Sequence, residues 1–361
     1  MATLPAGAYN TSKRTYTAFK VGDVVEGGSE RVTRGLWSGN VGTLTTFHTS
    51  SAQSSTQKQY YYEIFDGVST ASTSVAQFSV TYGNKLGSGS LSVNEDSPSQ
   101  AIYSQYAQTL LPANQQTFEF NSVSTNQIYV VNLNRARIKD RLDPGNFQLN
   151  LATLSGSAVA NASHTGSNVF VVTAGQVVSL IDDSGDTNQA ANQPGRVFNL
   201  VSGSITNGVY SPKTYYGAVY PEQGTIVLNA DTLNSNLDFN TVTGSNINGD
   251  NAFKLFTSIS GAAAINSTNY GFAARNEEEV KSTFYFVRAK NGEYNFSNNK
   301  TFSTSSTGAF TQTTFVNNPK SYITTIGLYN NKQELLAVAK LSQPILKSFS
   351  NEILVKVKLD F

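Results

Sequence analysis

The feature that most constrains the fold of this chain is an alternation of apolar and polar side chains with a period of two. The alternation is clearest at the C-terminal end, residues 352–361. One set of positions there is apolar (Ile353, Val355, Val357, Leu359 and Phe361) and the intervening set is charged (Glu352, Lys356, Lys358 and Asp360), with Leu354 as the single exception. Successive side chains of a strand point to opposite faces. The pattern therefore predicts a final strand with one buried face, held within a sheet.

The same alternation predicts strands along the rest of the chain. Residues 322–328 and 335–341 form two β-rich runs joined by a short polar segment, which is typical of a hairpin, and Pro344 is expected to end the pairing because it cannot donate to a ladder. Further strands are predicted at 60–65, 77–82, 126–133, 147–151, 168–172, 196–201, 225–229 and 282–290.

Helix signals are few. Ser97 followed by Pro98 is typical of a helix start, and apolar side chains then recur every four residues up to Pro112. A second short helix is predicted at 252–260. The sequence thus predicts an all-β protein of mainly antiparallel, sandwich-like sheets with one or two short helices.

Changes of composition suggest two regions. Residues 1–112 are rich in Gly, Ser and Thr, and we expect them to form an N-terminal β region or arm that ends in the first helix. Residues 113–361 are expected to form one or more sandwich-like domains, with a polar loop or insertion near 232–265.

Composition excludes several classes of function. The chain has no cysteine and two histidines, which rules out disulfides, thiolate metal sites and histidine-rich metal centres. The 25 Lys and Arg are balanced by 24 Asp and Glu, so a protein that coats nucleic acid is not expected. No apolar run reaches the length of a membrane span, and the first residues lack the apolar core of a secretory signal. We therefore expect a soluble protein that folds in a cytoplasm.

Three groups of residues are candidates for metal or catalytic chemistry. Asp182, Asp183 and Asp186 could offer oxygen ligands to calcium, but a polar turn is the simpler interpretation. The run 277–279 contains three glutamates, for which a solvated turn is favoured over the paired carboxylates of a glycosidase. His48 and His164 are interpreted as surface residues. We expect no catalytic residue, no metal and no cofactor.

Two segments are candidates for protein interfaces. Arg135, Arg137, Lys139 and Arg141 alternate with other residues, so on a strand all four would share one face, which could dock a carboxylate-bearing partner or simply be solvated. The second segment contains four aromatic side chains: Tyr210, Tyr215, Tyr216 and Tyr220. These tyrosines could anchor a protein interface, stack on sugars or pack over a loop.

Several segments together resemble one family of proteins. They are 101–111 (AIYSQYAQTLL), 128–151, 195–204, 216–229, 251–260, 282–299 and 321–361, of which NRARIKDRLDPGNF and the C-terminal segment are the most distinctive. In order and character, residues 95–361 resemble a virion structural protein of tailed myophages, in particular the T-even-like phages of marine bacteria and cyanobacteria.

The resemblance implies a non-enzymatic structural subunit that is assembled into a virion in the host cytoplasm. By analogy we expect a baseplate position or one at the tail–fibre junction, with other virion proteins as partners and several copies or a homo-oligomer in the particle. A capsid decoration or neck protein is one alternative. A receptor- or glycan-binding tail protein is the other. Neither nucleic-acid binding nor membrane insertion is expected.

Overall fold

The computed structural model describes residues 18–37, 42–49, 60–68, 70–90, 97–154, 172–185, 195–243, 250–265, 270–296, 301, 304 and 309–360. The chain forms two compact units: a smaller unit from residues 1–30 and 280–361, and a larger unit from residues 31–279. The fold is mostly β, and the strand pairs of defined register are antiparallel. The predicted fold class is therefore confirmed.

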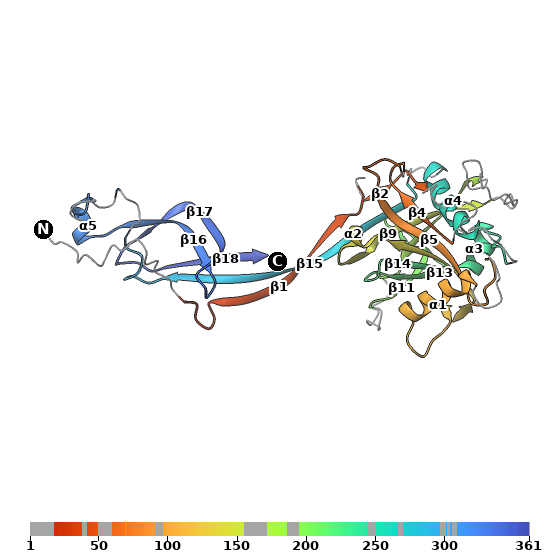
Figure 1. Ribbon diagram of the computed structural model, residues 1–361, viewed down its shortest axis with the longest axis horizontal. Helices are drawn as coiled ribbons and strands as arrows, with labels where there is room; N and C mark the ends of the chain where they lie inside the picture. The colour runs from red at the N-terminus through yellow and green to blue at the C-terminus, as the bar shows by residue number, and fades with distance from the viewer. Residues whose placement is uncertain are drawn as a thin grey trace. The chain divides into compact units, whose positions relative to one another are not determined.

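The larger unit is built on one long sheet (Figure 1). The strands of the larger unit are β2 (Thr43–Leu44), β3 (His48–Thr49), β4 (Tyr61–Phe65), β5 (Ala76–Asn84), β6 (Phe118–Phe120), β7 (Val123–Thr125), β8 (Gln127–Leu133), β9 (Arg141–Leu154), β10 (Val172–Asp182), β11 (Phe198–Ser204), β12 (Gly208–Val209), β13 (Tyr215–Tyr220) and β14 (Thr225–Asn229). Of these, β6 and β7 pair only with each other, as a separate hairpin. Two strands, β1 (Val24–Gly35) and β15 (Phe272–Ala289), contribute residues to both units. The helices of the larger unit are α1 (Pro98–Leu110), α2 (Arg135–Ile138), α3 (Ala230–Leu237) and α4 (Asp250–Ile265).

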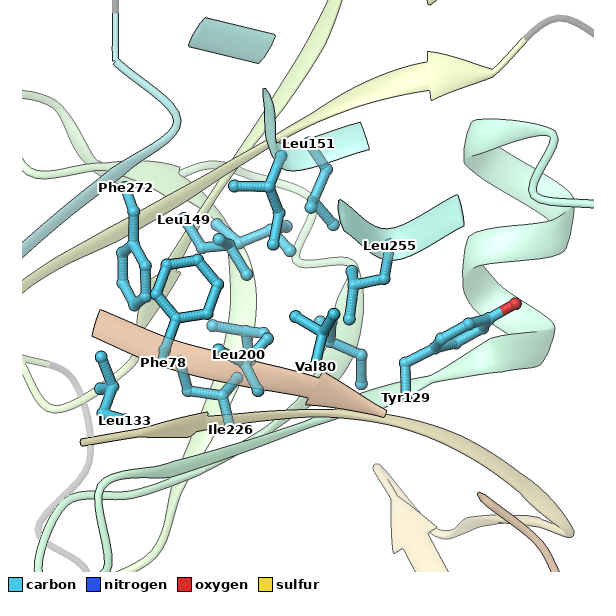
Figure 2. Close-up of a cluster of buried hydrophobic side chains, with 14 of the residues drawn as sticks. Phe78, Val80, Tyr129, Leu133, Leu149, Leu151, Leu200, Ile226, Leu255 and Phe272 are labelled. Atoms are coloured by element: carbon cyan, nitrogen blue, oxygen red, sulfur yellow. The ribbon is translucent and has the colours of Figure 1, made fainter. Parts of the chain in front are cut away.

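The long sheet curls around its own core. Along the sheet the strands follow the order β15-β9-β10-β11-β13-β14-β8-β5, so β15 and β5 stand far apart in the order of pairing. Even so, the ring of Phe78 on β5 lies 5.5 Å from the ring of Phe272 on β15 (Figure 2). Leu149 from β9 and Leu255 from α4 belong to the same buried cluster. The sheet therefore closes one apolar core, which α3 and α4 help to cover.

The central strand β8 shows how the alternating pattern fills both faces of the sheet. Tyr129 and Val131 lie in the core just described, whereas Ile128 and Val130 lie in a second buried cluster with α1 and the β6–β7 hairpin. The boundary that was expected near Pro112 falls inside the larger unit, because the segments on either side of that proline share this second cluster.

The two predicted helices are confirmed within α1 and α4. Ser97 does occupy the N-cap position of α1, but its hydroxyl makes no capping bond and instead donates to the carbonyl oxygen of Gly87 at 2.7 Å. The segment near 232–265, expected to be a polar loop or insertion, contains most of α3 and the whole of α4, while residues 244–249 lie outside the described part. Among the described residues, no helix has the length and apolar character that crossing a membrane requires.

The smaller unit contains β16 (Ser321–Tyr329), β17 (Leu335–Lys347), β18 (Ile353–Asp360) and the short helix α5 (Thr314–Asn317), together with the parts of β1 and β15 that belong to it (Figure 1). Strand β18 pairs with β15, and Val357 stands opposite Tyr285. The C-terminal strand is thus confirmed: Ile353 and Val357 are buried, and Leu354 is 60% exposed on the charged face. Phe361 lies outside the described residues.

The hairpin of β16 and β17 is also confirmed, but the expected role of Pro344 is wrong. Strand β17 continues through Pro344 to Lys347, and Ile345 stands opposite Ile323. The register shifts between this pair and the next, Thr325 opposite Lys340, so extra residues of β17 form a bulge around the proline. A bulge leaves residues without ladder bonds, and proline is tolerated there.

Candidate functional site

A large groove lies within the smaller unit, along β16. Its volume is about 1250 Å³. Its wall contains every residue of β16, residues 286–289 of β15, and apolar side chains from other segments (Phe19, Phe296, Phe315, Ile353 and Val355). Because consecutive side chains of a strand point to opposite faces, a groove that touches all of them runs along the edge of the strand.

Strand β16 pairs with β17 on one side, and none of the described strands pairs with its other edge. Unpaired backbone N–H and C=O groups of an edge strand can bond to an added strand. The groove therefore combines hydrogen-bonding backbone with apolar side chains, which is the chemistry that an extended polypeptide requires.

Several apolar side chains around the groove are in contact with solvent. Tyr322 is 65% exposed and Phe296 is 48% exposed. Among the described residues of the unit, Ile326, Leu328 and Val357 form a buried cluster, and the side chains packed against them are half-buried. The described strands of the smaller unit thus bury few large apolar side chains fully.

A buried lysine positions one wall of the groove. Lys347, at the end of β17, is 0% exposed, and its ammonium donates to the carbonyl oxygens of Asn291 and Ser348 at 2.8 Å and to Oδ1 of Asn295 at 3.0 Å. These bonds fix the turn that carries Tyr294 and Phe296 into the groove wall. Burial lowers the pKa of Lys347, while the nearby carboxylates of Glu293 and Glu352 act in the opposite direction.

The two units differ in charge. The smaller unit contains 13 Lys and Arg against 7 Asp and Glu, whereas the larger unit contains 12 Lys and Arg against 17 Asp and Glu. At the groove, Nη2 of Arg288 lies 3.4 Å from Oδ1 of Asp23, and Lys320 lines the wall. The near-neutral net charge of the whole chain therefore hides a basic and an acidic part.

The predicted basic face does not exist as a strand face. Residues 135–138 form α2, whose N-cap Asn134 accepts a hydrogen bond from the backbone N–H of Ala136 at 3.0 Å, so the four cations cannot share one side of a strand. Arg135 donates to the backbone carbonyl of Glu222 at 2.7 Å, and Arg137 lies 3.5 Å from Asp66. Asn134 explains the difference, because an asparagine at the N-cap position favours a helical turn over a strand.

The other two cations pair with the glutamates of 277–279. Lys139 forms an ion pair with Glu278, and Arg141 lies 2.6 Å from Glu277, which is 2% exposed and also lies 3.1 Å from Arg31. Burial raises the pKa of Glu277, but the hydrogen bond and charge of Arg141, with Arg31, outweigh it and leave the pKa below its usual value. The glutamate run is thus an ion-pairing segment, and Glu277 is buried rather than part of a solvated turn.

The tyrosine segment is divided between the surface and the core. Tyr210 is 43% exposed and Tyr215 is half-buried, whereas Tyr216 and Tyr220 are buried in the two different core clusters. A bulge where β13 pairs with β11, near Tyr215, explains why two residues four apart face opposite sides of the sheet. Of the four tyrosines, only Tyr210 and Tyr215 can reach a partner without unfolding.

Two of the remaining predicted positions, Asp182 and Asp183, take part in local hydrogen bonds. Asp182 accepts from the backbone N–H of Gly145 at 2.9 Å, and Asp183 accepts from that of Asn199 at 2.9 Å. Within the described ranges, no group of three or more His, Asp or Glu side chains could hold a metal ion. His48 is half-buried. Asp186 and His164 lie outside the described residues.

The groove was not among the candidates that the sequence suggested. The sequence predicted the strand at 322–328, but no local pattern marks that strand as the wall of a groove. A second, much smaller hollow, lined by Tyr60, Tyr82 and Ser99 among others, has a volume of about 10 Å³, enough for one water molecule.

Comparison with protein-family models, curated proteins and solved structures gave no match to this chain.

Proposed function

We propose that this chain is a non-enzymatic structural subunit of a tailed-phage virion, in the baseplate or at the tail–fibre junction, that acts through protein–protein interfaces. The observation that carries the proposal is the exposure of large apolar side chains on the strands of the smaller unit. They are Tyr322, Leu335, Leu336, Val338, Leu346 and Leu354, all at least 36% exposed.

Such a surface supports a role in assembly. Monomeric proteins limit contiguous exposed apolar surface, and they protect long edge strands because both features promote association. Packing against neighbouring subunits removes the apolar side chains from water and satisfies the open strand edges. The resemblance of residues 95–361 to myophage structural proteins supports the virion as the assembly in question.

The test is the location of the protein in the particle. An antibody raised against the chain, followed by gold labelling and electron microscopy of intact virions of the phage that encodes it, should label the distal end of the tail. Label spread over the head would indicate a decoration protein and would overturn the baseplate position. Virions without the protein, by labelling and by mass spectrometry of purified particles, would overturn the structural role.

The enzymatic alternative has a separate test. Purified protein is incubated with host surface polysaccharide, and reducing ends are measured over time. We expect no increase above a heat-treated control. A sustained release of reducing ends would contradict the non-enzymatic assignment and would support a glycan-cleaving tail protein.

A further inference from the structure

We propose that the groove along β16 is the docking site for an extended strand from a second copy of this chain, and that the larger unit of the second copy supplies the contact. This inference rests on the proposed structural function and names the partner of the groove. The contact would add a strand to the free edge of β16 and cover the apolar wall around Tyr322 and Phe296.

The backbone geometry limits what can fill the groove. Every residue from Ser321 to Tyr329 lines it, so the occupant must follow the strand edge over its whole length. A compact small molecule would use only part of such a site. An extended polypeptide can form main-chain hydrogen bonds along the edge while its alternate side chains contact the apolar wall, as in other cases of strand addition.

Charge favours a second copy of this chain as the occupant of the groove, with the larger unit of one copy against the smaller unit of the other. Two smaller units, each with 13 basic and 7 acidic side chains, repel one another. The larger unit has 12 basic and 17 acidic side chains, so it attracts the smaller unit of another molecule. A contact between unlike surfaces is heterologous, and it leads to a ring when the rotation closes or to a filament when it does not.

The experiment measures self-association of the full chain by analytical ultracentrifugation, at low and high salt, for the wild type and two variants. Tyr322→Glu places a charge in the groove wall, where the side chain is 65% exposed. Phe349→Glu places the same charge elsewhere in the smaller unit, at an aromatic side chain that is 58% exposed and is not part of the groove wall. Both positions are solvent-exposed, so both variants are expected to fold.

We expect the wild type to associate in a concentration-dependent manner, and more weakly at high salt because screening reduces the attraction between the units. Tyr322→Glu should weaken association about tenfold or more, and Phe349→Glu should leave it nearly unchanged. Hydrogen exchange of the associated wild type should show new protection of backbone amides in 321–329. A monomeric wild type, equal effects of the two variants, or association without that protection would overturn the inference.

The outcomes separate this inference from the proposed function. If the virion contains the protein but the purified chain stays monomeric, the assignment of a second copy as the partner of the groove is wrong, and the proposed structural role is unaffected. If a different virion protein binds the groove and Tyr322→Glu abolishes that binding, that protein is the partner and the assignment of a second copy is wrong. If the chain associates through the groove but is absent from virions, the proposed function is wrong and the groove is still an interface.

Discussion

Arg141 and Glu277 stand far apart in the sequence, yet Nη2 of Arg141 lies 2.6 Å from Oε1 of Glu277. Arg141 is the first residue of β9 and stands directly opposite Glu277 of β15, because the two strands pair in the sheet of the larger unit. Two segments that looked like separate surface features are therefore partners of each other, and their ion pair is the basis of the first prediction.

Replacing Glu277 should strongly destabilise the larger unit. Glu277 is 2% exposed, and Glu277→Ala would leave the half-buried guanidinium of Arg141 without its carboxylate, a loss of about 3–5 kcal/mol for a buried pair. Glu278→Ala is the matched control, because Glu278 and Lys139 are more exposed and such pairs contribute about 0–1 kcal/mol. Urea unfolding of both variants measures the difference. Equal losses of unfolding free energy in the two variants would show that the buried ion pair stabilises the fold no more than the exposed pair does.

The contribution of Glu277 should depend on pH. Its pKa lies below its ordinary value of 4.5 because the hydrogen bond and charge of Arg141 outweigh the opposing effect of burial. A carboxyl with a lower pKa in the folded state stabilises the protein above the unfolded value, and that stability is lost as pH falls through the folded value. We therefore expect the difference in unfolding free energy between wild type and Glu277→Gln to shrink as pH falls below 4.5.

Asp182 provides a control of opposite sign for the pH series. Burial raises its pKa above 3.8, although hydrogen bonds from Ser184 and Gly145 oppose the shift. As pH falls toward 3.8, the wild type should gain stability relative to Asp182→Asn, because its folded state binds the proton more readily. Parallel pH profiles for the Glu277 and Asp182 variants would contradict both assignments.

Lys347 should be essential to the smaller unit. Its ammonium is fully buried, and it donates to three carbonyl oxygens of the surrounding loops. Lys347→Met would remove all three of these hydrogen bonds from the buried site, at a cost of about 2–4 kcal/mol. Lys340→Met, on an exposed part of the same strand, should change stability by less than about 0.5 kcal/mol. Thermal unfolding followed by circular dichroism compares the two; similar melting temperatures would contradict the role of Lys347.

The two faces of β18 should respond differently to truncation. Val357 is buried against Ile326 and Leu328, so Val357→Ala should cost about 1–3 kcal/mol. Leu354 is 60% exposed, so Leu354→Ala should cost less than about 0.5 kcal/mol. Denaturant midpoints of the two variants provide the measurement. A larger loss for Leu354→Ala would mean that Leu354, and not Val357, faces the core in solution.

A glycine in β13 should tolerate no side chain. A Cβ at Gly217 would lie on the carbonyl oxygen of Val227 in the neighbouring strand, so Gly217→Ala must push the two strands apart. We expect a loss of about 2 kcal/mol or more, or an insoluble protein. Gly28→Ala is the control, because nothing lies within 4 Å of its added Cβ. Normal stability of Gly217→Ala would contradict the close approach of β13 and β14.

Local patterns in the sequence determined much of the secondary structure. The alternation at 352–360 predicted the strand β18 and singled out Leu354, and the four-residue spacing after Pro98 predicted α1. These predictions succeed because the period of a strand or helix depends on neighbours in the chain. The glutamates at 277–279 and the cations at 135–141 were also visible in the sequence, but not as partners.

What only the tertiary structure decided is how distant segments meet. The cap of Asn134 on α2 and the bulge near Tyr215 each break a regular alternation, and no local period reveals such breaks. The smaller unit joins residues 1–30 with 280–361, and the groove runs along an edge of β16 with which no described strand pairs. Pairing, burial and open edges depend on contacts between residues far apart in the chain, which the side-chain pattern of a single segment does not encode.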